Sequence, residues 1–145
     1  MSVEKNVKIK VISTICPIEG DEETYELWLQ GVWLKKNGKM YLRYEEIIED
    51  QTIRTTVKMN NDDALILRSG AVNMRLPFST ECKQNGHYDT MYGTLPLQTK
   101  TYHLGFEHVD EDNISGRFNV QYDLIISGQS VGHYTLEIQY TEGQA

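Results

Sequence analysis

The chain has 145 residues, with 14 lysines and arginines against 21 aspartates and glutamates, and its formal net charge at pH 7 is −7. This length is typical of one domain, which we expect to span residues 1–145. The negative charge repels phosphate backbones and anionic membranes, and the basic residues are scattered along the chain. We therefore expect neither a nucleic acid nor a membrane as a partner.

The sequence predicts a cytoplasmic protein. Its first residues contain no apolar segment of the kind that begins a secreted protein, and no stretch approaches about 18 uninterrupted apolar residues. Cys16 and Cys82 lie far apart and lack the spacing of a C-x-x-C or Cys/His ligand motif. Two free thiols in a reducing compartment explain this arrangement most simply.

The first predicted strand includes Val7–Val11, where apolar residues alternate with lysines so that one face is buried. Pro17 and Gly20 end this strand.

A long hairpin follows over Glu23–Ile47, with Asn37-Gly38 at its centre. This pair favours a type I′ turn because both central residues of such a turn need φ > 0. The turn sets Trp33 opposite Leu42, and opposite residues share a face. Because one face of the hairpin collects apolar side chains and the other carries charges, we expect the apolar face to line the core.

Gln51–Met59 alternates cleanly and predicts a half-buried strand. Asn60–Asp63 supplies turn residues, and Ala64–Arg68 predicts a short strand. A further alternating segment, Val72–Phe78, contains Pro77, which has no N–H to donate to a ladder. We therefore expect Pro77 to face an edge or a bulge.

Asn85-Gly86 is expected to form a second hairpin turn, which would lead into a short strand at His87–Thr90. In Gly93–His108 the apolar positions change from odd to even numbers. A regular strand cannot change its phase without an inserted residue, so we expect a bulge or bend near Gln98–Thr101.

Two alternating segments end the chain, Phe118–Ile126 and Tyr134–Tyr140. Placing Leu124 opposite Tyr134 aligns their apolar faces. That alignment predicts a three-residue loop, Gly128–Ser130.

No helix of ordinary length is predicted, although Glu45–Asp50 or the region of Ser79-Thr80 would accommodate a single helical turn. Many short strands joined as hairpins are typical of an up-and-down barrel or a sandwich. Because closure removes exposed strand edges, we expect an all-β fold, a single antiparallel up-and-down β-barrel of about eight to ten strands. Such a barrel is either filled by its side chains or holds one small ligand.

A resemblance to a known family supports this fold. The resemblance is carried by Met74-Arg75-Leu76-Pro77-Phe78 and Tyr88-Asp89-Thr90 within Gly70–Thr101, by Arg68-Ser69-Gly70 before them, and by Gly116 and Val120–Leu124 after them. These residues resemble the YwiB-like family of small bacterial proteins, a domain of unknown function. The resemblance implies a calycin-type, lipocalin-like β-barrel in the cytoplasm of a Gram-positive bacterium, and it implies no activity.

The polar residues form no recognisable catalytic or metal-binding motif. On a regular strand His103 and His108 would point to opposite faces, and His133 falls on an outward phase, so we predict no metal site. Asp89 is the candidate for an enzymatic acid or base, and its structural alternative is a hydrogen bond at a turn or ladder end. We predict no catalytic residue and no cofactor.

Ligand binding is the hypothesis that the aromatic residues favour. Aromatic side chains on the inward phase either pave a cavity, where hydroxyls orient a guest, or fill the barrel. An arginine fork at the mouth would grip a carboxylate or phosphate, although Arg68 and Arg75 both fall on outward phases. The candidate contacts to a small apolar or amphipathic ligand are Trp33, Tyr44, Arg75, Phe78, Tyr88, Asp89, Tyr102, Phe106, Tyr122 and Tyr134.

The outer face of the central hairpin carries a second apolar cluster, Trp28, Val32, Leu34 and Tyr41. Such a cluster is typical of a homodimer or partner contact, and a covering loop explains it equally well. Three functions therefore remain open: non-enzymatic binding of a small ligand in the barrel, an interaction or scaffold module with a filled barrel, and an enzyme with a site near Asp89.

Overall fold

The computed structural model describes residues 2–110 and 112–143, and this part of the chain contains ten strands and no helix. The strands are β1 (Ser2–Pro17), β2 (Glu23–Lys36), β3 (Lys39–Ile48), β4 (Gln51–Met59), β5 (Asp63–Gly70), β6 (Asn73–Ser79), β7 (Gln84–Thr90), β8 (Gly93–Asp110), β9 (Ile114–Ile126) and β10 (Gln129–Glu142). They form one closed barrel in the order β1-β10-β9-β8-β7-β6-β5-β4-β3-β2. Every neighbouring pair is antiparallel, which confirms the predicted all-β barrel. Among the described residues, no helix has the length and apolar character needed to cross a bilayer.

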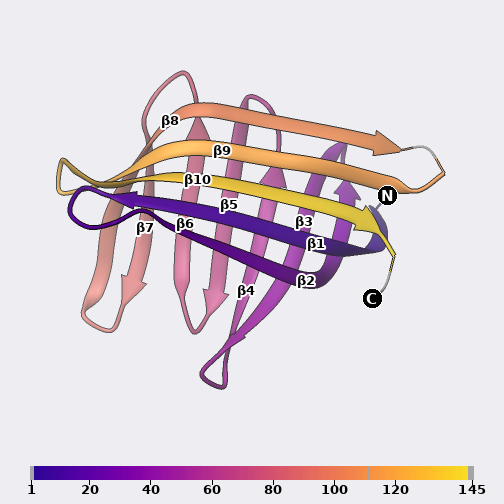
Figure 1. Ribbon diagram of the computed structural model, residues 1–145, viewed down its shortest axis with the longest axis horizontal. Helices are drawn as coiled ribbons and strands as arrows, with labels where there is room; N and C mark the ends of the chain where they lie inside the picture. The colour runs from indigo at the N-terminus through magenta and orange to yellow at the C-terminus, as the bar shows by residue number, and fades with distance from the viewer. Residues whose placement is uncertain (1, 111, 144–145) are drawn as a thin grey trace.

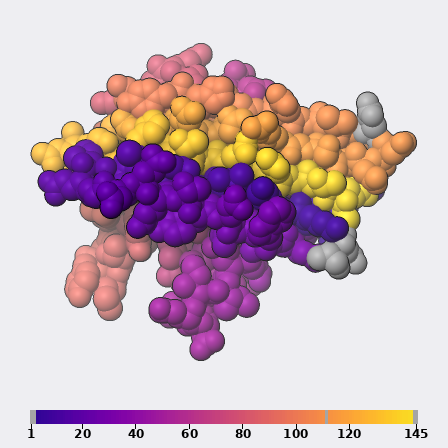
Figure 2. Space-filling view, viewed as in Figure 1, coloured from indigo at the N-terminus to yellow at the C-terminus, as the bar shows by residue number. Residues whose placement is uncertain are grey.

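The barrel is flattened into two layers of strands that cross each other (Figure 1). β8, β9, β10, β1 and β2 run side by side across the front layer, whereas β3 to β7 run crosswise behind them. Figure 2 shows the side chains of these strands packed side by side over the front layer. β1 begins and β10 ends at the same end of this layer.

The core lies between the two layers. Its fully buried side chains include Leu42, Val57, Phe118, Val120 and Ile138. They come from β3, β4, β9 and β10, so both layers contribute to one apolar interior. Burial of each such side chain stabilises the fold by roughly 1.5–3 kcal/mol.

The central hairpin has the predicted turn and register. Asn37 and Gly38 have φ angles of 54° and 79°, as a type I′ turn requires. Trp33 pairs with Leu42 across β2 and β3.

The predicted three-residue loop before the last strand is wrong. Ser127 and Gly128 form a two-residue turn with φ angles of 53° and 79°, and Gln129 pairs with Ile126. The register then shifts between Ser130 and Gly132, so Tyr134 lies opposite Tyr122 rather than opposite Leu124. A bulge in β10 therefore aligns the apolar faces, where we expected a longer loop to do so.

The predicted turn at Asn85-Gly86 is also wrong, because both residues lie within β7. The chain reverses instead over residues 80–83, between β6 and β7. A Cβ at Gly86 would lie 2.1 Å from the Arg75 carbonyl oxygen and 3.0 Å from the Pro77 Cδ. Gly86 is therefore required by the close approach of β6 and not by a turn. Pairing between β6 and β7 covers only Asn73–Arg75 of β6, so Pro77 lies beyond the ladder, as expected.

The bulge predicted near Gln98–Thr101 is present in β8, directly after Thr101. The register with β9 shifts between Thr101 and His103, which makes Tyr102 the extra residue. Tyr102 therefore points outward and is 50% exposed, so its predicted inward orientation is wrong.

Neither of the segments considered for a helical turn is helical. β3 continues to Ile48, and a tight turn at Glu49 and Asp50, with φ angles of 51° and 64°, leads into β4. At the other segment β6 ends at Ser79 and a bend follows.

β2 and β3 separate part-way along their length. β3 pairs with β2 only through Gly31–Lys36, whereas the earlier part of β2, Glu23–Gln30, pairs with β1 alone. Beyond Tyr44, β3 pairs only with β4 and the hairpin that they form extends away from the front layer (Figure 1). The barrel wall therefore opens between the first half of β2 and the second half of β3. We call this opening the seam.

Candidate ligand-binding site

A cavity of about 340 Å³ lies between the two layers beside the seam. Residues of β1 (Val11 to Ile15), β9 and β10 form one wall, and residues of β3, β4, β5 and β6 form the opposite wall. Tyr25 and Leu27 of β2 reach the cavity from the seam and are partly exposed there. The cavity lies toward the end of β1, away from the end where β1 begins.

Besides Tyr25, three tyrosines from different strands line this cavity: Tyr44 of β3, Tyr122 of β9 and Tyr134 of β10. The rings of Tyr122 and Tyr134 stack with centroids 5.2 Å apart and an interplanar angle of 10°. Burial raises the pKa of Tyr44 to about 12 and also raises the pKa of Tyr122. Both hydroxyls therefore stay protonated at neutral pH and are available to donate hydrogen bonds.

An ion pair lies at the cavity mouth. Arg68 of β5 and Glu46 of β3 both line the cavity, and an Arg68 guanidinium nitrogen donates to Glu46 Oε1 over 3.4 Å. The sequence prediction that Arg68 points outward is wrong, because Arg68 continues the inward phase of Ala64 and Ile66. The charge of Arg68 lowers the pKa of Tyr44 and of Tyr122, against the larger effect of burial.

Thr55 of β4 adds a neutral polar group to the same wall. The residue is 2% exposed, and its hydroxyl lies beside the Tyr44 hydroxyl, whose pKa it lowers, without a hydrogen bond of ordinary geometry in the described part of the chain. A buried hydroxyl that lacks such a bond costs folding free energy, which a bound polar group can recover.

Comparison with known proteins places this barrel in a family. A family described as a domain of unknown function, DUF1934, matches residues 9–138. The chain belongs to the DUF1934 family. It is 28% identical over 132 residues to the uncharacterized beta-barrel protein YwiB of Bacillus subtilis, covering 91% of each chain. Its fold is also similar to a crystal structure of the ywiB protein from Bacillus subtilis, with a TM-score of 0.83, 29% identity, and coverage of 97% of this chain and 94% of that chain.

Of the predicted ligand contacts in this DUF1934 chain, the cavity brings together Tyr44, Tyr122 and Tyr134. Arg68, Glu46 and Thr55 add polar groups to this lining. The predicted contacts did not include them, although Arg68 was considered as part of an arginine fork. The alternation of buried and exposed residues could have identified them, because each of these residues lies at one of the more buried positions of the alternation in its own strand.

Four predicted contacts lie in the core outside the cavity lining. Phe78 is buried against the Tyr122 ring, with centroids 4.7 Å apart, and Tyr88 packs on the core from β7. Trp33 stacks on His108 at the opposite end of the barrel, with Phe106 beside them. These aromatic side chains fill the barrel, so the structure combines a filled end with a hollow one.

The remaining three predicted contacts lie on the outer surface. Arg75 is exposed and donates to the Asn85 carbonyl oxygen at 3.2 Å, so its outward phase is confirmed. Asp89 is exposed and accepts a hydrogen bond from the Thr94 hydroxyl at 2.9 Å. Tyr102 donates to Asp123 at 2.6 Å. None of the three is among the residues that line the cavity.

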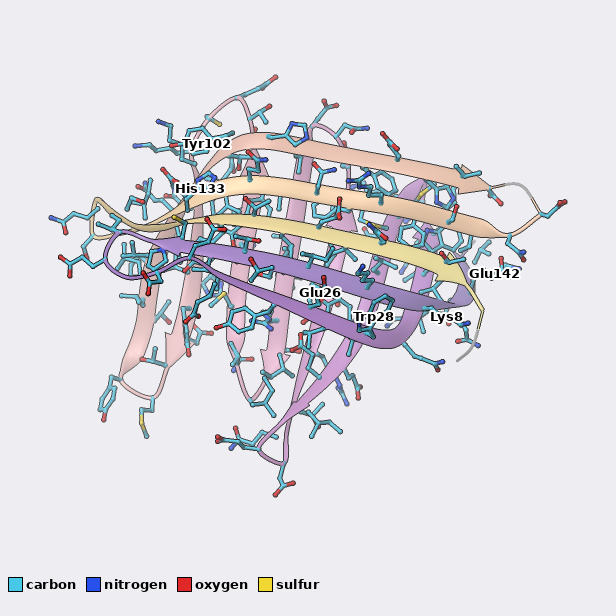
Figure 3. The ribbon with its side chains drawn as sticks, viewed as in Figure 1. Lys8, Glu26, Trp28, Tyr102, His133 and Glu142 are labelled. Carbon is cyan, nitrogen blue, oxygen red and sulfur yellow. The ribbon has the colours of Figure 1, made fainter. Side chains whose placement is uncertain are left out.

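Asp123 joins Tyr102 and His133 in a cluster on the front layer (Figure 3). Burial raises the pKa of the Asp123 carboxyl, but hydrogen bonds from Tyr102 and His133 lower it more, so the net pKa lies below its usual range. No group of three His, Cys, Asp or Glu side chains in the described residues has an arrangement that could hold a metal ion.

The predicted outer cluster is divided. Val32, Leu34 and Tyr41 are half-buried, whereas Trp28 is 71% exposed and lies in a groove with Lys8 and Lys10. Trp28 and Leu34 are six residues apart on one strand, which separates them by roughly 20 Å. Trp28 is therefore an isolated exposed aromatic and not part of one continuous patch.

Proposed function

We propose that this DUF1934 protein binds a small, largely apolar molecule in the cavity beside the seam and acts without catalysing a reaction. The observation that carries the proposal is the cavity itself, whose aliphatic and tyrosine walls enclose about 340 Å³. Ligand sites are usually mostly apolar cavities of about 300–1,000 Å³ with a few placed polar groups. The exposed cysteines, which form no disulfide, are consistent with action in a reducing cytoplasm.

Native mass spectrometry of gently purified protein tests this proposal. We expect an added mass that disappears under denaturing conditions. Ser13 lines the cavity, so Ser13→Phe should fill it and remove the added mass. The neighbouring Thr14 points to the outer face, so Thr14→Phe is the matched control and should retain the added mass.

A wild-type spectrum without an added mass leads to a second measurement, in which 3-phenylpropan-1-ol is titrated while methyl resonances are recorded by NMR. The methyl groups of Val11, Ile66 and Leu136 face the cavity and should shift. No added mass together with no methyl shift would contradict ligand binding.

The exposed Trp28 supports a second candidate function, self-association of two copies through the front layer. Lys8 and Lys10 lie on one side of Trp28, on β1, and Glu26 precedes it on the same face of β2 (Figure 3). A two-fold axis near Trp28 would bring the lysines of one copy to Glu26 of the other, which makes the patch self-complementary. Tryptophan is also enriched among residues that dominate binding energy.

Light scattering after size exclusion tests this second candidate. The wild type should have the mass of a dimer, and Trp28→Asp should have that of a folded monomer. Gln121→Asp adds the same charge at an exposed position of β9 outside this groove and should leave the dimer intact. A monomeric wild type would rule out self-association, and a dimeric Trp28→Asp would rule out this surface.

A further inference from the structure

We propose that the ligand of the cavity is a small monocarboxylate with an apolar, ring-sized body, and that Arg68 binds its carboxylate. This inference rests on the proposed function and names the chemical class of the ligand. Arg68 and Glu46 are the charged side chains in the cavity lining. Whether the ligand is an anion or a cation therefore depends on which of these two side chains is free to bind it.

Arg68 is the more accessible member of the pair. Its side chain is 32% exposed, compared with 13% for Glu46. The hydrogen bond between them, at 3.4 Å, is longer than the roughly 2.7–2.9 Å of a strong charge-assisted bond. A guanidinium has five N–H donors, and Arg68 uses one of them in its contacts with the described residues. The others remain available for a bidentate contact with a planar carboxylate.

The neutral polar groups around Arg68 favour an anion as well. Tyr44 and Tyr122 lie close enough for the Arg68 charge to lower their pKa values, although burial raises both and Glu46 also raises that of Tyr44, so both hydroxyls are protonated donors. The Thr55 hydroxyl, which lies beside Tyr44, adds a further polar group on the same wall. Donors converging on one point are the usual arrangement for holding an oxyanion.

The net charge of the protein groups in the site favours a ligand that carries a single negative charge. Arg68 and Glu46 together are neutral, so a carboxylate bound to Arg68 adds one uncompensated charge near Glu46. A phosphate monoester would add nearly two, and its repulsion from Glu46 would be correspondingly larger. The site therefore favours a carboxylate over a phosphate.

The volume limits the size of the apolar body. A cavity of about 150 Å³ holds a benzene ring, so about 340 Å³ accommodates one ring with a short side chain. Met74, Leu76, Leu124 and Leu136 provide the apolar surface against which such a ring would pack.

Three probes of one shape test the inference: 3-phenylpropionate, the neutral 3-phenylpropanamide and the cation 3-phenylpropylammonium. Binding to the wild-type protein is followed by NMR shifts of the methyl groups in the cavity. We expect the acid to bind at least about tenfold more tightly than the amide, since a charge-assisted contact is lost in the amide. The cation should bind most weakly. Phenyl phosphate, as a fourth probe, should bind more weakly than the acid.

Two variants and a matched control identify the residue responsible. Arg68→Met should remove the preference for the acid while the amide still binds. Arg75→Met removes an exposed arginine from the outer face of the adjacent strand and should leave the preference unchanged. Glu46→Gln removes the competing carboxylate and should tighten binding of the acid.

The outcomes separate the two proposals. Equal affinity for acid and amide, or an unchanged preference in Arg68→Met, would overturn the carboxylate inference and leave ligand binding intact. Stronger binding of phenyl phosphate would replace carboxylate with phosphate. Absence of shifts with every probe up to about 10 mM would overturn both the inference and the proposed function.

Discussion

His108 lies at the filled end of the barrel, where its ring is nearly parallel to that of Trp33, at 3°, with centroids 5.2 Å apart. Its Nδ1 shares a hydrogen bond of 2.6 Å with the Tyr140 hydroxyl, while its Nε2 is buried without a partner in the described residues. A charged imidazolium would need a partner at Nε2, so the folded protein favours the neutral ring. Burial accordingly lowers the pKa of His108 below its usual value of 6.5.

The lowered pKa of His108 predicts a loss of stability in mild acid. Below pH 6.5 the unfolded chain binds a proton at His108 that the folded chain resists, so the unfolding free energy falls as pH decreases toward the folded-state pKa. Above pH 6.5 the ring is neutral in both states, so His108 no longer lowers the unfolding free energy. Urea unfolding of the wild type between pH 7.5 and 5, compared with His108→Gln, measures the effect; the variant should show a flatter dependence.

His103 provides the control for this experiment, because it is exposed on the same strand. His103→Gln should keep the full pH dependence of the wild type. If His108→Gln and the wild type lose stability equally on acidification, titration of His108 is not the cause.

Among the strands, Gly31 fixes the point at which β2 leaves β3. A Cβ at this position would lie 2.4 Å from the Arg43 carbonyl oxygen and 2.6 Å from Ile9 Cδ1. Only a residue without a side chain lets β3 approach β1 and β2 this closely at the start of the seam. The same close approach buries Tyr44, the cross-strand partner of Gly31, on the inner wall.

Gly31→Ala should therefore destabilise the barrel, by about 1–3 kcal/mol as overpacking usually does. Thermal unfolding followed by circular dichroism measures the change. Gln30→Ala, at the neighbouring position of β2, is the control and should alter stability much less. A Gly31→Ala protein as stable as the wild type would show that β2 and β3 move apart at no cost, and that Gly31 does not determine the seam.

Strand phase and turn chemistry allowed most of the barrel to be predicted from sequence. The Asn37-Gly38 turn was found because its residues are required by the local backbone conformation. The same reasoning failed at Asn85-Gly86, where the glycine is required by a neighbouring strand. A close approach between strands depends on tertiary packing and leaves no local signature.

The candidate site was predicted less completely than the fold. Alternation identified the inward tyrosines, but Tyr102 was misplaced because it is itself the extra residue of the bulge in β8. A single-residue shift reverses the face of a side chain, so contacts near a bulge are the least secure. Arg68 was considered as part of an arginine fork but was set aside because its phase was assigned as outward, although Ala64 and Ile66 on the same strand place it on the inward phase.

In the molecule as a whole, the strands around the cavity differ in how completely they are paired with their neighbours. β10 pairs with β1 on one side and with β9 on the other along most of its length. In contrast, the segment Glu23–Gln30 of β2 pairs with β1 only, and Glu45–Ile48 of β3 pairs with β4 only. Every second amide of these two segments points toward the seam and makes no ladder hydrogen bond. The cavity thus lies beside a part of the barrel where each strand edge is held by a single ladder.

Hydrogen exchange measured by NMR should reveal this asymmetry. Amides of Glu23–Gln30 and Glu45–Ile48 should exchange faster than those of β9 and β10, because local opening there disrupts one ladder instead of two. A ligand in the cavity contacts Tyr25, Leu27 and Glu46 on both sides of the seam, so binding should slow exchange in these segments more than in the rest of the barrel. Uniform protection along β2, with no change at the seam when 3-phenylpropionate is bound, would show that the seam is closed in solution and that ligands enter elsewhere.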